Sequence, residues 1–155
     1  MSVIIETGEP AGTLPAKPKR NTGQAVLRGT MCKCPACGNG RVFDGYLKVR
    51  TNCDACGEAL HHHRADDAPP YFTIFLVGHI IIPLSLAVEI AYRPEIWIHM
   101  ALWLPLTIFS ALFFLRPIKG ALIGLQWGLY MHGFDPEAGD PDEVFYSAPE
   151  GAASQ

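Results

Sequence analysis

The chain has 155 residues, of which 49% are hydrophobic and 17% are charged, and its formal net charge is −3 at pH 7. The positive mean hydropathy is not that of an ordinary soluble domain. The charge balance lacks the basic field of a dedicated nucleic-acid binder, so no nucleic-acid partner is expected. Residues 1–30 contain no apolar stretch like that of a secretory signal, and a cleaved leader is not expected either.

Both ends of the chain are predicted to be disordered tails. Residues 1–24 are rich in Pro, Gly, Thr and Lys and show no periodic apolar pattern. Residues 134–155 form an acidic tail, since the chain from position 132 onward carries six Asp or Glu residues and no Lys or Arg. Neither tail has enough apolar side chains to build a packed core.

Two Cys-x-x-Cys pairs form the most specific motif in the sequence. Fifteen residues separate Cys34 and Cys37 from Cys53 and Cys56, and a Gly follows the second Cys of each pair. This spacing predicts a metal site of four thiolates that binds zinc, with iron in the same sulfur cage as the open alternative. Because four protein ligands leave no coordination position open, the site is predicted to stabilise a fold and to carry out no chemistry.

The residues between the two pairs favour short β-strands. Residues 41–43 and 46–50 flank Asp44 and Gly45, a pattern typical of a hairpin. We therefore expect residues 25–60 to form a small β zinc ribbon, entered through a short helix from Gln24 to Met31. Without its metal, a module with so few apolar side chains would not fold.

Further candidate metal ligands flank the ribbon. Cys32 is a fifth thiol, and His61, His62 and His63 open a predicted juxtamembrane linker over residues 61–70. These residues are either bystanders or auxiliary ligands for a soft or borderline metal ion. Adjacent histidines cannot all point at one ion, which favours the first interpretation.

Two long uncharged runs predict a transmembrane helix hairpin over residues 71–115. The runs cover residues 68–88 and 96–115, each long enough to cross a bilayer, and seven residues connect them. Nine basic residues precede the hairpin, whereas Arg93 is the single one in its loop. The positive-inside rule then predicts two spans in a bacterial inner membrane with both termini cytoplasmic, where thiolates stay reduced.

His79 is the titratable residue nearest the middle of a span. We expect it to be neutral and hydrogen-bonded to a partner helix, because ionisable groups inside a membrane are costly. His99 is expected near the outer interface, beside Glu89 or Glu95. The two histidines differ in depth by roughly 9 Å at the helical rise per residue, so they are not expected to bind a haem together.

A glycine-rich segment follows the second span. Gly120, Gly124 and Gly128 recur at every fourth position and predict a flat helix face that another backbone can approach closely. The uncharged run over residues 120–134 is short for a span. Residues 117–133 are therefore predicted to form an interfacial helix, with a third short span or a continuation of the second helix as open alternatives.

Several of these motifs occur together in one known family. The residues concerned are the Cys-Pro-x-Cys-Gly knuckle with its second Cys pair, Arg41-Val42-Phe43, Tyr71-Phe72, Arg116-Pro117 and Gln126-Trp127. Over roughly residues 29–133 the chain resembles the bacterial membrane proteins of the domain-of-unknown-function family numbered 983. The resemblance implies no settled activity. It implies an association with cytochrome c oxidase, because genes of some members lie among those for oxidase subunits and assembly factors.

These observations favour a non-enzymatic membrane protein whose ribbon and helices bind a respiratory complex such as cytochrome c oxidase or its assembly factors. The alternative is a metal-handling protein that delivers or senses zinc, copper or iron for a membrane enzyme. An enzyme is not expected, because the sequence contains no nucleophile constellation, no phosphate-cradling Gly loop and no carboxylate pair at catalytic spacing. For the same reason no catalytic residue and no small-molecule substrate is assigned.

Overall fold

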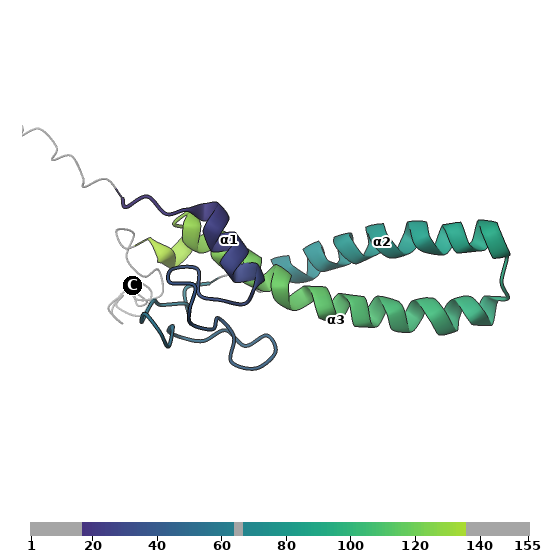
Figure 1. The fold of residues 1–155 in the computed structure, drawn as a ribbon, viewed down its shortest axis with the longest axis horizontal. Coiled ribbons are helices and arrows are strands. Elements are labelled where there is room, and N and C mark those ends of the chain that lie inside the picture. The colour runs from purple at the N-terminus through teal and green to yellow at the C-terminus, as the bar shows by residue number, and fades with distance from the viewer. Residues whose placement is uncertain (1–16, 64–66, 136–155) are drawn as a thin grey trace, which may run out of the picture.

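The protein consists of a long helical hairpin with a compact body at one end (Figure 1). The computed structural model describes residues 17–63 and 67–135. Its elements are α1 (Thr22–Thr30), α2 (Ala68–Tyr92), α3 (Ile96–Gly128) and a short 3-10 helix, η1 (His132–Phe134). Of the two predicted disordered tails, residues 1–16 and 136–155 lie outside the part of the chain that the structure describes.

The two helices of the hairpin are long and apolar enough to cross a membrane. In their most apolar windows only 11% of the residues of α2 and none of those of α3 are buried. A helix in a soluble core would instead be largely buried. The hairpin begins earlier than predicted, at Ala68, because Pro69 and Pro70 occupy the first turn of α2, where a missing N–H costs nothing.

A hydrogen-bonded trio joins the helices at the far end of the hairpin. His99 Nε2 lies 2.9 Å from Glu89 Oε2, and Trp103 Nε1 donates to His99 Nδ1 at 3.0 Å. Since Nδ1 accepts this bond, the network assigns the proton to Nε2, which donates to the Glu89 carboxylate. The prediction that His99 lies beside Glu89 or Glu95 is confirmed, with Glu89 as the partner.

Within the chain, His79 bonds to its own helix, and the predicted bond to a partner helix stays a prediction. Its Nδ1 lies 2.8 Å from the carbonyl oxygen of Phe75, one turn earlier in α2. The two rings pack together with centroids 4.1 Å apart, and the side chain of His79 is exposed on the hairpin. A carbonyl four residues back on the same helix therefore pairs with one of the two ring nitrogens of His79.

The prediction of a separate interfacial helix over residues 117–133 is wrong. Helix α3 continues without a break through Pro117 to Gly128. Of the two alternatives to an interfacial helix, continuation of the second helix is therefore the observed one. Proline removes a single hydrogen bond from the helix interior, which kinks a helix without necessarily ending it. The segment beyond Pro117 is held in place by its contact with α1.

The glycine face of α3 lies against α1, within the same chain. A Cβ atom on Gly120 would lie 2.1 Å from the carbonyl oxygen of Gly29, and one on Gly124 would lie 2.3 Å from that of Ala25. Such distances mean that the two helix backbones touch, which only glycine allows. The sequence predicted that another backbone approaches the glycine face closely, but it did not indicate which segment supplies that backbone.

Residues 17–24 are ordered, which corrects the predicted tail. The side chain of Asn21 caps α1 by accepting from the backbone N–H of Gln24 at 3.0 Å. The guanidinium of Arg20 lies 4.1 Å from the ring centroid of Trp127 and 4.0 Å from that of Tyr130. Composition alone could not reveal these aromatic partners, because they lie more than 100 residues away.

The ribbon has the predicted turns but no regular strand in the residues that the structure describes. Three isolated antiparallel bridges join Lys33 to Arg41, Phe43 to Val49, and Asn52 to Ala59. The β ribbon is therefore not confirmed as a sheet. The reason is that the Cys loops and turns take up most of the short segment, which leaves single residue pairs to form a ladder. A buried cluster of Val42, Phe43, Ile123 and Phe134 joins this region to α3.

We predict that Gly120→Ala and Gly124→Ala each destabilise the body by about 1–3 kcal/mol, the usual cost of overpacking. The added methyl group would force α1 away from α3. Thermal unfolding and protease sensitivity of the body in detergent measure the effect. Gly78→Ala is the matched control, because its Cβ would have ordinary contact, 3.9 Å from Ile82. Equal stability of all three variants would contradict a contact between the two backbones.

Candidate metal centre

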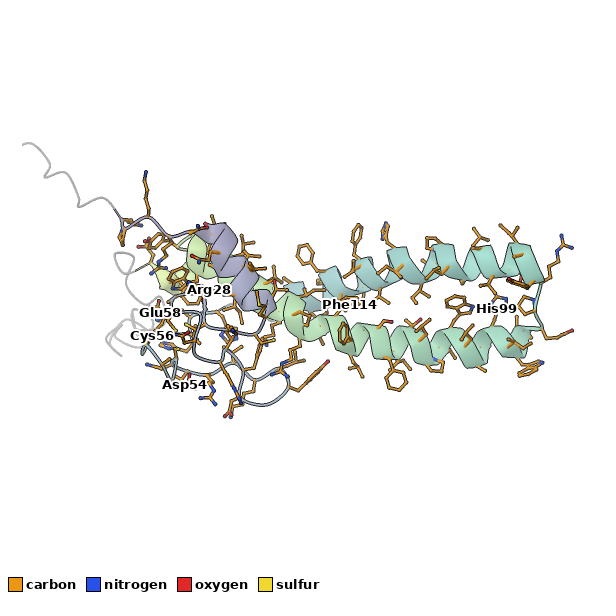
Figure 2. The ribbon with its side chains drawn as sticks, viewed as in Figure 1. Arg28, Asp54, Cys56, Glu58, His99 and Phe114 are labelled. Atoms are coloured by element: carbon orange, nitrogen blue, oxygen red, sulfur yellow. The ribbon has the colours of Figure 1, made fainter. Side chains whose placement is uncertain are left out.

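The sulfur atoms of Cys34, Cys37, Cys53 and Cys56 converge on one point. All four lie within 4.8 Å of one another. The Sγ atoms of Cys34 and Cys56 are 3.8 Å apart, as are those of Cys37 and Cys53. The four ligands come from two loops of the body, with Cys56 on the loop that also carries Asp54 and Glu58 shortly after it (Figure 2).

The two loops have matching knuckle geometry. In the first, the N–H of Gly38 donates to the carbonyl of Cys34 at 2.8 Å, and in the second that of Gly57 donates to Cys53 at 3.0 Å. Both glycines have left-handed backbones, with φ of 74° and 75°, a conformation that a Cβ makes costly. The Gly after each pair thus turns the chain so that both sulfurs of a pair face one centre.

The spacing of the sulfurs fits a tetrahedral metal ion. Four thiolates at the usual Zn–S distance of about 2.3 Å form a tetrahedron with edges of about 3.8 Å. The Cys34–Cys56 and Cys37–Cys53 pairs of sulfur atoms have this separation. A disulfide would need about 2.05 Å. The four cysteines are therefore positioned to hold one metal ion, and zinc is consistent with the site. Iron prefers the same sulfur cage, so the geometry does not separate the two metals.

Backbone donors and burial affect the thiols in opposite ways. The N–H groups of Gly40 and Asn39 lower the pKa of Cys37 to about 6, because they stabilise its thiolate. Burial raises the pKa of Cys34 well above its usual range. A metal ion replaces the proton on Cys34, so its binding is what makes a buried thiolate stable.

Two contacts that sequence analysis did not find hold the centre in the body. Arg28 of α1 donates to the carbonyls of Pro35 and Ala36 at 3.0 and 2.8 Å, inside the first Cys loop. Trp127 of α3 donates through Nε1 to Glu58 at 2.7 Å, two residues after the second loop. The one sequence signal for the first contact was the position of Arg28 in the last turn of the lead-in helix, close to the first Cys pair.

Gly40 lets the two loops approach. A Cβ at this position would lie 2.2 Å from the sulfur of Cys53, so any larger residue would push the second loop away. The carbonyl of Gly40 also accepts from the N–H of Cys34 at 2.8 Å. This glycine follows the first motif and was not singled out by its spacing.

The candidate auxiliary ligands do not join the centre. Within residues 17–63 and 67–135, the four cysteines form the one group of three or more potential ligands. Cys32 packs against the buried cluster around Val42 and Phe43. His61 and His63 have ring nitrogens 3.4 and 3.0 Å from backbone carbonyls, and the ring of His62 meets Phe134 edge-on, with centroids 6.0 Å apart.

A comparison with protein families matches more than half of the chain. The model described as "Protein of unknown function (DUF983)" covers residues 43–127. The chain belongs to this family. The DUF983 match contains the second Cys pair, the hairpin, and Gly120 and Gly124 of the glycine face, and it begins after the first Cys pair. Comparison with curated proteins found no match, and comparison with solved structures found none.

We predict that this DUF983 protein binds about one metal ion per chain and that Cys37→Ser or Cys53→Ser removes it, because three thiolates hold the ion less tightly than four. Cys32→Ser is the matched control, since Cys32 lies outside the sulfur cluster. Elemental analysis of the purified variants gives both the amount and the identity of the metal. Retention of the metal by the Cys37 and Cys53 variants would disprove the four-thiolate site.

We also predict that metal affinity falls as the pH falls, and falls more steeply below pH 6. Above that value Cys37 is already a thiolate, whereas below it this thiol too must lose a proton when the metal binds. The slope of the logarithm of the binding constant against pH should rise by about one. Competition with a chelator of known proton affinity between pH 5 and 8 measures the slope. A constant slope through pH 6 would contradict the lowered pKa of Cys37.

Proposed function

We propose that the protein is a non-enzymatic integral protein of the bacterial inner membrane whose metal centre shapes a cytoplasmic interaction module. The observation that carries this proposal is that four cysteine sulfurs converge at the spacing of a closed tetrahedral site. Four thiolates leave no position for a substrate or an activated water. The metal therefore has a structural role, and zinc is the proposed ion.

The proposed orientation follows from the charges and from the thiols. Basic residues are concentrated on the side of the body, whereas Arg93 is the single basic residue at the far turn. The body, and with it both termini, then faces the cytoplasm. The reducing conditions there keep four neighbouring cysteines available for a metal ion.

The glycine face is not the binding surface for a partner, because α1 already covers it. The available surfaces are the apolar hairpin and a few exposed apolar side chains of the body, among them Leu27 of α1 and Met31 directly after that helix. A respiratory membrane complex, such as cytochrome c oxidase or its assembly factors, is the proposed partner. Its support is the gene association implied by the family resemblance.

The experiment that tests this function is affinity purification from native membranes in a mild detergent. We expect another membrane protein to co-purify, and the Cys37→Ser variant to lose it while remaining in the membrane, because the partner binds a body that the metal shapes. Mass spectrometry identifies the partner. Recovery of a partner-free protein from cells that make the oxidase would overturn the proposal.

Two measurements on the same material separate the remaining possibilities. Labelling of the cysteines in intact cells by a membrane-impermeant reagent would place the body outside and overturn the cytoplasmic orientation. A second metal ion per chain, or rapid exchange of the first with a weak chelator, would favour the metal-handling alternative. A single ion that resists mild chelators supports the structural role.

A further inference from the structure

A cavity lies in the body beside the end of the hairpin. It has a volume of ≈ 460 Å³, in the range of small-ligand sites. Four cationic side chains line it, together with one acidic side chain and the ring of Phe43. The cationic residues are Lys33, Arg41, Arg50 and Arg116, and the acidic residue is Asp44.

The positive charge of this cavity is not balanced within the described chain. Arg50 forms ion pairs with Asp44 at 3.9 Å and with Asp54 at 3.5 Å. Among the described residues, no carboxylate pairs with the side chains of Lys33, Arg41 or Arg116. The Nε atoms of Arg50 and Arg116 are buried and have no hydrogen-bond partner there. Buried donors without acceptors are uncommon in folded proteins, so the cavity is suited to an anion.

The position of Arg116 connects the cavity to the bilayer. Arg116 directly follows the uncharged run over residues 96–115. In the proposed membrane-spanning arrangement this puts its side chain at the level of the lipid head groups. Phe113 and Phe109 lie three and seven residues before Arg116, on the same face of α3. They line an open apolar hollow of ≈ 490 Å³ along the hairpin. The Tyr46 hydroxyl donates to the carbonyl of Leu112, so a loop of the ribbon also reaches the end of the span.

We propose that this cavity binds the phosphate group of an anionic phospholipid, with an acyl chain lying along the Phe109–Phe113 face. Arginine side chains suit phosphate because the guanidinium presents paired donors to its oxygens. A free phosphate would use the same donors, but the apolar hollow next to Arg116 favours the lipid. The inference rests on the membrane-spanning part of the proposed function, and it is independent of the partner.

The test uses the full metal-loaded chain in a zwitterionic detergent. Native mass spectrometry measures binding of phosphatidylglycerol, of phosphatidylcholine, and of inorganic phosphate alone. We expect one phosphatidylglycerol per chain to bind in preference to phosphatidylcholine. Arg116→Gln and Arg41→Gln should each weaken binding about tenfold, the effect of losing one charged hydrogen bond. Lys48→Gln is the matched control, because this exposed ribbon residue does not line the cavity.

Each result of this lipid-binding experiment either supports the site or overturns it. Arg116 also lies 5.7 Å from the ring of Phe43, so its variant is checked by metal content, while Arg41 has an exposed side chain whose loss leaves that contact in place. If Lys48→Gln weakens binding as much as Arg41→Gln, the attraction is unspecific and the site is disproved. Equal binding of both lipids overturns it too. Binding of inorganic phosphate as tight as that of phosphatidylglycerol overturns the assignment to a lipid. The metal content of these samples, and their need for detergent extraction from membranes, are measured as well. If both are retained while lipid binding fails, this inference fails and the proposed function does not.

Discussion

The contact between the backbones of α1 and α3 is the constraint on which the arrangement of the protein depends. Gly29 and Gly120 bring the two helices together so closely that neither can carry a side chain at the crossing. This contact fixes α1 on the end of the hairpin. Arg28 then ties α1 to the first Cys loop, and Trp127 ties α3 to the region after the second. The metal centre is thereby held next to the membrane end.

The metal centre and the helix contact have complementary roles. The loops that carry the cysteines contain isolated bridges in place of a sheet, so regular backbone pairing contributes little to their stability. The buried cluster around Val42 and Ile123 supplies a small apolar core between ribbon and helix. A metal ion held by the four cysteines would add the cross-link that such a short segment requires. The body is therefore a joint product of thiolates, glycines and a few apolar side chains.

The hairpin and the body meet in a region that combines different physical demands. Apolar side chains on α2 and α3 need lipid around them, whereas the cationic residues near Arg116 need anions or water. Helix α3 passes through both environments because Pro117 interrupts only one hydrogen bond of its ladder. A continuous helix makes the body and the hairpin mechanically connected.

Features that depend on local spacing and composition can be predicted from the amino-acid sequence alone. The two Cys pairs, their glycines and the two long apolar runs each carry their own signal. The family resemblance was confirmed by the match over residues 43–127. Which surfaces of the protein meet is visible in the folded structure alone. It assigned the glycine face to α1, Arg20 to Trp127 and Tyr130, and Cys32 to the apolar cluster. It also replaced a separate interfacial helix with one continuous α3. These outcomes depend on contacts between distant segments, and a local pattern contains no record of its partner.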